Sequence, residues 1–156
     1  MNPYVVVLGI GGVIAGISWL TREKPPRAFI SFAVEDARMR DLFVGQAKHK
    51  KVPWKFEDAS LHEPFSEKWK TQARERIKRS GVVIQLVGES TYRADGAIWE
   101  VQCACDEGIP AFGVWISKDG KHKVPSCFAR DDVIAWSWDG VQGRLAKAVK
   151  ARTGSK

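Results

Sequence analysis

Three apolar runs of the chain are each followed by hydroxyl or carboxylate side chains, and the next predicted helix carries a Trp-Glu pair close to its start. If these runs are parallel strands, the polar side chains follow their carboxyl ends, which meet at one edge of the sheet. In a doubly wound sheet, ligands bind at that edge, at the switch point between strands one and three. The candidate site residues are Ser31, Phe32, Asp58, Ser60, Ser90, Thr91, Trp99 and Glu100.

The same edge lacks the residues that three well-known functions of such sheets require. A phosphate-receiving domain needs an Asp at the end of the third strand, where this chain has Gly88 and Glu89. A flavin mononucleotide site needs a Ser-, Thr- and Gly-rich loop after the first strand, where the acids Glu35 and Asp36 stand instead. A Rossmann-type site needs glycines after that strand, and the sequence has none there. We therefore expect no bound cofactor.

The cysteines and histidines indicate neither a metal site nor a disulfide framework. Cys103, Cys105 and Cys127 are odd in number, and the first two would face different sides of a helix. The histidines lie at no spacing to these cysteines that zinc sites use. We expect no metal, and reduced thiols in a reducing compartment.

Strand and helix signals alternate from Arg27 onward and predict one α/β domain. The predicted strands span residues 27–33, 52–56, 81–87, 109–116 and 132–136. The predicted helices span residues 35–48, 66–79, 95–107 and 141–152. Ser66 is a typical N-cap and Gly108 a typical C-terminal stop. The alternation predicts a doubly wound, flavodoxin-like parallel sheet of five strands in the order 2-1-3-4-5, covered by helices on both faces.

The N-terminal region contains an uncharged apolar run from Tyr4 to Leu20. As a helix it would be about 25 Å long, at the short end for crossing a bilayer. A cleaved signal peptide and a buried core helix are the alternatives, but no positive charge precedes the run and its four glycines would weaken a helix in water. Basic residues follow it at once, which puts that side in the cytoplasm. We expect residues 1–26 to form a single transmembrane anchor and linker, and residues 27–156 to form a cytoplasmic domain at the cell membrane.

Positive charge is concentrated at the C-terminus of a chain whose net charge is +7. The last 16 residues carry five cations and no acid: Arg144, Lys147, Lys150, Arg152 and Lys156. Such a tail could lie on anionic membrane lipid at about 1 kcal/mol per charge, or form the solvated face of a helix. Because the basic balance comes from a tail rather than a groove, we expect no specific binding of nucleic acid.

Four segments of the chain occur in an order that is typical of one known family. Residues 28–32 (AFISF) are similar to its opening strand, and residues 56–60 (FEDAS) to the pattern after its second strand. Residues 77–88 resemble the start of its third strand, and residues 90–91 with 98–100 (IWE) resemble the loop and helix of its Trp-Glu motif. Together they resemble the TIR-like domains, most closely the branch that includes the sensor subunit of the Thoeris antiphage system.

This resemblance implies an enzyme that cleaves the nicotinamide–ribose bond of NAD, which is its substrate. The bond cleavage would be followed by hydrolysis or by cyclisation to a cyclic ADP-ribose-type signal. The resemblance further implies prokaryotic antiphage defence, homo-oligomers formed through TIR–TIR contacts that complete the site, and a downstream effector that senses the nucleotide product. The family does not require an N-terminal anchor.

Within this resemblance, Glu100 is the catalytic residue. Cleavage of an N-glycosidic bond passes through an oxocarbenium-like transition state, and a carboxylate at the exposed edge of the sheet would stabilise that cation. Trp99 and Phe32 would contact rings of the substrate. The remaining candidates would contact its ribose or phosphate groups: Ser31, Asp58, Ser60, Ser90 and Thr91.

The same residues are compatible with a second function. A TIR-like domain held at the membrane could act as a scaffold or sensor through protein–protein contacts, without turnover. In that case Trp99 would be a core residue and Glu100 a surface residue of its helix. The sequence leaves both functions open.

Overall fold

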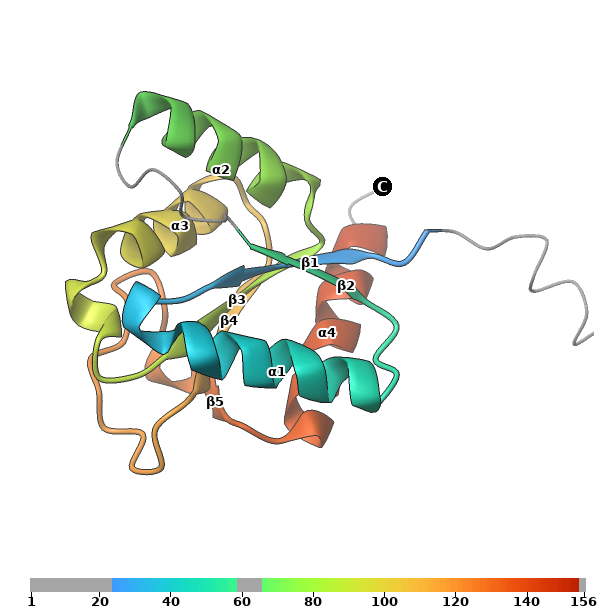
Figure 1. Ribbon diagram of the computed structural model, residues 1–156. Coiled ribbons are helices and arrows are strands. Elements are labelled where there is room, and N and C mark those ends of the chain that lie inside the picture. Colours follow the sequence, from blue (N-terminus) through green and yellow to red (C-terminus); the bar gives the residue numbers. More distant parts are fainter. Residues whose placement is uncertain (1–23, 59–65, 155–156) are drawn as a thin grey trace, which may run out of the picture.

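The sheet has the predicted topology. The computed structural model describes residues 24–58 and 66–154. These residues form a five-stranded sheet of order β2-β1-β3-β4-β5, in which neighbouring strands run parallel (Figure 1). The strands are β1 (Arg27–Ser31), β2 (Lys55–Asp58), β3 (Val82–Val87), β4 (Ala111–Trp115) and β5 (Val133–Ala135).

Helices cover both faces of the sheet, as expected for a doubly wound fold (Figure 1). The helices are α1 (Ala37–His49), α2 (Glu67–Arg79), α3 (Asp95–Asp106) and α4 (Trp138–Thr153). Helices α1 and α4 pack on one face, and α2 and α3 pack on the other. Three short 3-10 turns are also described. The turn Val34–Asp36 follows β1, the turn Thr91–Arg93 follows β3, and the turn Arg130–Asp132 precedes β5.

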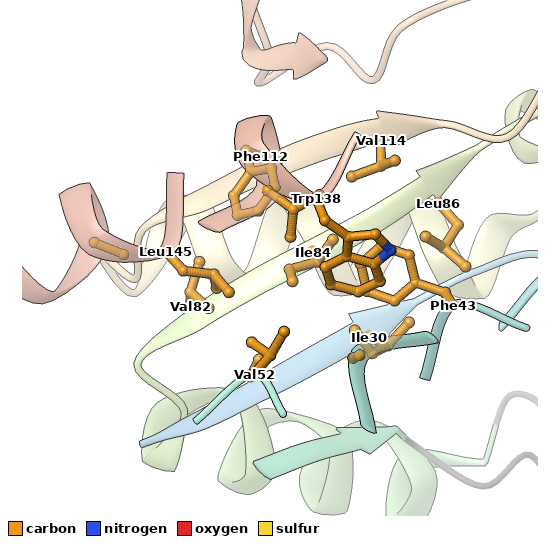
Figure 2. Packing of buried hydrophobic residues seen from close by; sticks show 14 residues of the cluster. Ile30, Phe43, Val52, Val82, Ile84, Leu86, Phe112, Val114, Trp138 and Leu145 are labelled. Atoms are coloured by element: carbon orange, nitrogen blue, oxygen red, sulfur yellow. The ribbon is translucent and has the colours of Figure 1, made fainter. Parts of the chain in front are cut away.

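The face under α1 and α4 is a continuous apolar core (Figure 2). Ile30 and Ile84 from the sheet meet Phe43 of α1 and Trp138 of α4, whose ring centroids lie 4.9 Å apart. Burial of such large side chains stabilises the fold by about 1.5–3 kcal/mol each. This face therefore supplies stability and holds α1 and α4 against the sheet.

The face under α2 and α3 is different because polar side chains interrupt it. Phe29 and Val83 are apolar and pack against these helices. Ser31 lies two residues after Phe29, and Gln85 lies two residues after Val83. Because side chains alternate along a strand, both lie on the same face as those residues. Ser31 and Gln85 are also paired in the register of β1 and β3. Both are completely buried, which places two polar groups beneath α3.

Helix ends follow the predicted signals. The Ser66 hydroxyl accepts a hydrogen bond from the Trp69 backbone N–H at 3.1 Å, which caps α2. Gly108 adopts φ +67° just after α3, the left-handed conformation that commonly stops a helix. Both predictions are confirmed.

Several boundaries differ from the prediction. Strand β2 begins at Lys55 rather than at residue 52, because the chain first turns through Lys51 at φ 53° and packs Val52 into the α1–α4 core. Helix α4 begins three residues earlier than predicted, since the Ser137 hydroxyl accepts from the Gly140 N–H at 3.2 Å and caps it. The start predicted for the first helix forms a 3-10 turn instead.

No helix in residues 24–58 and 66–154 is long and apolar enough to cross a membrane. The predicted anchor, residues 4–20, lies outside these ranges, so its existence stays a prediction.

Candidate active site

Glu100 lies on the sheet-facing side of α3, where it is only 4% exposed. It was predicted at an exposed edge, and that expectation is wrong. Ala97, Val101 and Ala104 form the buried stripe of α3, and Glu100 falls within that stripe at helical spacing. Its carboxyl group is therefore inside the domain, at the ends of β1 and β3.

Burial changes the acidity of this carboxyl group. Desolvation, with a smaller contribution from the negative charge of Asp58, raises the pKa of Glu100 from 4.5 to about 8. A hydrogen bond with the Ser31 hydroxyl acts in the opposite direction. A raised carboxyl pKa means that Glu100 is largely protonated at neutral pH.

Beneath Glu100, two strands reach the backbone of α3. The Ser31 hydroxyl donates to the Ala97 carbonyl at 3.2 Å, and the Gln85 amide Nε2 donates to the same oxygen at 3.1 Å. These two hydrogen bonds join β1 and β3 to the first turn of α3. They fix the position of the first turn of α3, which directly precedes the turn that carries Glu100.

Asp58 connects the site to the outer strand. Its carboxylate pairs with Arg40 of α1 at 3.0 Å, and its backbone carbonyl accepts from Arg76 of α2 at 2.7 Å. The Arg40 guanidinium also lies over the ring of Phe32, 5.2 Å from its centroid. The structure therefore brings Ser31, Phe32, Asp58 and Glu100 to the same end of the sheet.

Other predicted site residues lie elsewhere. The Trp99 ring faces α2, 5.4 Å from Trp69 and within cation–π distance of Lys70 (5.9 Å) and Arg74 (5.8 Å). It is partly buried and packs against the core formed by α2, α3 and the sheet.

The hydroxyl predicted at the end of β3 has a structural partner. Thr91 is buried, and its Oγ1 accepts from the Gly88 N–H at 2.9 Å and lies 3.3 Å from the Leu86 carbonyl. Ser90 is half-buried, and its carbonyl accepts from the Arg93 N–H at 3.2 Å. Ser60 lies outside the described residues.

Sequence reasoning missed Gln85 and Arg40. Gln85 stands inside the run VVIQLV, which was interpreted only as an apolar strand. A lone amide in a strand covered on both faces is itself a signal, because a buried polar group needs partners. Arg40 gave no such signal, because its role depends on the approach of α1 to the end of β2.

Two cavities of the described part of the chain lie near this end of the sheet, and Glu100 lines neither of them. One of about 610 Å³ opens at the ends of β4 and β5, between Trp115 and Trp136. A smaller cavity of about 130 Å³ lies beside Thr91 and Tyr92. In this conformation the carboxyl group of Glu100 is closed off from both.

Comparison with known families decides the relationship that these motifs suggest. The family profile described as Thoeris protein ThsB, TIR-like domain, matches residues 29–121. The chain belongs to this ThsB TIR-like family. The matched region runs from β1 through β4 and includes Ser31, Asp58, Gln85 and Glu100. No curated protein sequence matches the chain.

Membership of the ThsB TIR-like family is consistent with a role in antiphage defence. The matched region ends shortly after β4, so β5 and α4 lie outside it. The buried carboxyl lies within the part of the fold that the family shares.

Proposed function

We propose that this domain cleaves the nicotinamide–ribose bond of NAD and that Glu100 is its catalytic residue. The observation that carries the proposal is a buried carboxyl group at the switch point of the sheet, with its pKa raised to about 8. Family membership supports the same site. NAD is the substrate, and the domain needs no separate cofactor for this reaction.

The chemistry follows from the charge of the substrate. When the bond between the ribose C1′ and the nicotinamide nitrogen breaks, its electron pair leaves with the nitrogen and the ribose becomes cationic. An ionised Glu100 would stabilise that cation in a site with little water. The positive nicotinamide ring of bound NAD would itself favour the ionised form. Attack of water on C1′ then gives a linear ADP-ribose product, whereas attack by a nucleophilic atom of the substrate itself gives a cyclic one.

The burial of Glu100 indicates how the activity would be regulated. NAD must reach a carboxyl group that is only 4% exposed, so the neighbouring segments must rearrange before turnover. We expect this rearrangement to accompany homo-oligomerisation through TIR–TIR contacts, with a downstream effector sensing the product. An isolated domain would then be inactive.

We further propose that the chain is held at the cell membrane. Residues 4–20 would anchor the chain, with the domain in the cytoplasm. Exposed basic residues at the end of α4, Lys147, Lys150 and Arg152, could then face anionic lipid.

The decisive experiment measures NAD loss and product identity in cells that express the chain. Glu100→Gln keeps the size of the side chain but cannot ionise, so turnover should fall by about 100-fold or more. Glu89→Gln is the matched control, because Glu89 is exposed at the same end of the sheet. Equal turnover by Glu100→Gln and the unmodified chain would remove Glu100 from catalysis.

The alternative function is a non-catalytic scaffold or sensor held at the membrane. It is favoured by the separation of Glu100 from both cavities at this end of the sheet. The unmodified chain, Glu100→Gln and Glu89→Gln would then all leave NAD intact, even when they are clustered with the N-terminal region present. That result would favour this alternative.

A further inference from the structure

The helices that connect the parallel strands all end at one edge of the sheet, the edge where the strands begin. A helix between two parallel strands must carry the chain back from the carboxyl edge to this amino edge. The segments that follow α1 and α2 arrive on either side of β1. The Lys55 N–H donates to the Pro26 carbonyl at 2.9 Å, and the Gly81 N–H donates to the Arg27 carbonyl at 2.7 Å.

The last helix ends at the same place. A Cβ atom on Gly81 would lie 3.2 Å from Nη1 of Arg152 at the end of α4, and 3.2 Å from the ring of Trp54 just before β2. Figure 1 shows α1, α2 and α4 ending on the side where β1 begins. The amino edge is opposite the edge that carries the candidate active site.

Exposed cations gather at these helix ends. The group, called the basic edge below, consists of Lys48, Lys50, Lys51, Lys78, Arg79, Lys150 and Arg152. No ion pair among residues 24–58 and 66–154 includes any of them. The acid Glu57 of β2 is already paired with Arg27 and Lys55. Because the basic edge comes from three separate stretches of sequence, only the fold brings it together.

The helix dipole explains part of this charge, because it favours cations in the last turn of a helix. It does not explain where the charge stops. Helix α3 has no cation in its last turn and closes with Asp106 and Glu107, on the way to β4. Conversely, the exposed Lys51 follows α1 and the exposed Lys24 precedes β1, and neither belongs to a helix. Positive charge therefore surrounds the start of β1 rather than every helix end.

The position of the apolar N-terminal run indicates what this surface binds. The run ends at Leu20, and the chain from there to Arg27 spans at most about 25 Å. A bilayer around the run would thus lie within reach of the basic edge. The cytoplasmic leaflet carries anionic lipid, which attracts Lys and Arg side chains close to its surface.

We infer that the basic edge binds the anionic surface of the membrane, with contacts from α1 and α2 as well as from α4. This inference rests on the membrane location proposed above and is independent of NAD cleavage. A sheet held in this way points the carboxyl ends of its strands away from the bilayer. The edge with Glu100 then faces the aqueous side, from which a water-soluble dinucleotide arrives.

The test compares the reactivity of individual lysines in the full-length chain. The chain is placed in phosphatidylcholine vesicles and in vesicles in which part of that lipid is replaced by phosphatidylserine. A water-soluble acetylating reagent is added, and mass spectrometry gives the rate at each lysine. In the anionic vesicles Lys48, Lys50, Lys78 and Lys150 should react more slowly by about fivefold or more, the factor expected for a cation held at such a surface. High salt should remove the difference.

Lysines at the opposite edge supply the internal control. Lys118, Lys121 and Lys123 are exposed in the loop after β4 and should react equally in both kinds of vesicle. The inference is overturned if the basic edge reacts equally in both, or if the lysines of the two edges are protected alike. If phosphatidylcholine vesicles do not retain the chain, the anchor is refuted. The comparison of anionic vesicles with the free chain then decides the inference.

A variant with one change in each helix tests whether the surface acts as a unit. Lys50→Gln, Lys78→Gln and Lys150→Gln together should abolish the protection of Lys48, which is unchanged in this variant. The matched variant combines Lys118→Gln, Lys121→Gln and Lys123→Gln. It loses the same charge from the opposite edge, so the protection of Lys48 should persist. Loss of protection in both variants would mean that net charge, and not this surface, attracts the lipid.

Nucleic acid is the competing partner, because its phosphates also attract exposed cations. A single-stranded RNA is therefore added to the chain in phosphatidylcholine vesicles, at the same salt concentration. The lysines of the basic edge should stay reactive. Protection by RNA without protection by anionic vesicles would overturn the inference and assign this surface to nucleic acid.

Discussion

At the scale of single residues, Glu100 is an ionisable side chain that is buried in the domain. A carboxyl whose pKa is raised on folding holds its proton more tightly in the folded chain than in the unfolded chain. Its contribution to stability is therefore complete below about pH 4.5 and declines as the pH rises to about 8.

Glu100→Gln should remove this pH dependence, since Gln resembles the protonated acid and does not ionise. The free energy of unfolding of the variant should exceed that of the unmodified chain by a margin that grows with pH. The margin should grow by up to about 1.4 kcal/mol per pH unit between the unfolded and folded pKa values. Urea unfolding at a series of pH values measures it.

Glu89→Gln serves as the control, because the exposed Glu89 should give a curve parallel to that of the unmodified chain. If Glu100→Gln also gives a parallel curve, Glu100 is ionised in the folded domain at neutral pH and its burial has been overcome by some other group.

At the scale of elements, the periodicity of the chain was sufficient to predict the sheet order and the four helices. Capping signals such as Ser66 and Gly108 also worked, because they act locally. The start of β2 could not be predicted, because it depends on how Val52 packs against distant helices. For the same reason the sequence could not show that Glu100 is buried or that Trp99 turns toward α2 rather than the site.

The middle of β4 contains a glycine that the packing requires. A Cβ atom at Gly113 would lie 2.9 Å from Val133 Cγ2 and 3.1 Å from Val87 Cγ2, both on stiff β-branched side chains. Gly113→Ala should therefore lower the free energy of unfolding by about 1–3 kcal/mol, the usual cost of overpacking. Chemical denaturation of the folded chain measures the loss.

Gly143→Ala is the matched comparison, because Gly143 lies in α4 with no atom within 4 Å of the added Cβ. It should raise stability by about 0.5–1 kcal/mol, since Ala favours a helix over Gly. A stabilising Gly113→Ala would mean that β4 and β5 can separate without cost.

At the scale of the whole molecule, the apolar run near the N-terminus differs in composition from the described domain. The domain buries its apolar side chains on both faces of the sheet. The run from residue 4 to residue 20 consists of apolar and small residues without a charge. A bilayer is the environment that such a segment favours.

The full chain should therefore stay with the membrane fraction after washes with high salt and alkaline carbonate. Removal of residues 1–26 should release it, unless the basic end of α4 holds it on acidic lipid, in which case high salt completes the release. Recovery of the full chain without detergent in the soluble fraction would contradict the anchor.

The hydrogen bond from Trp138 to Gln46 also has a consequence for how the chain is made. It spans 2.9 Å between the last helix and the first, across 92 residues of sequence. Every strand pairing is parallel, so each one needs an intervening crossover and no hairpin can form early. During synthesis, the apolar side of α1 must wait for α4 to leave the ribosome before it is covered. The chain is consequently most vulnerable to aggregation until α4 has been synthesised, and this helix closes the fold.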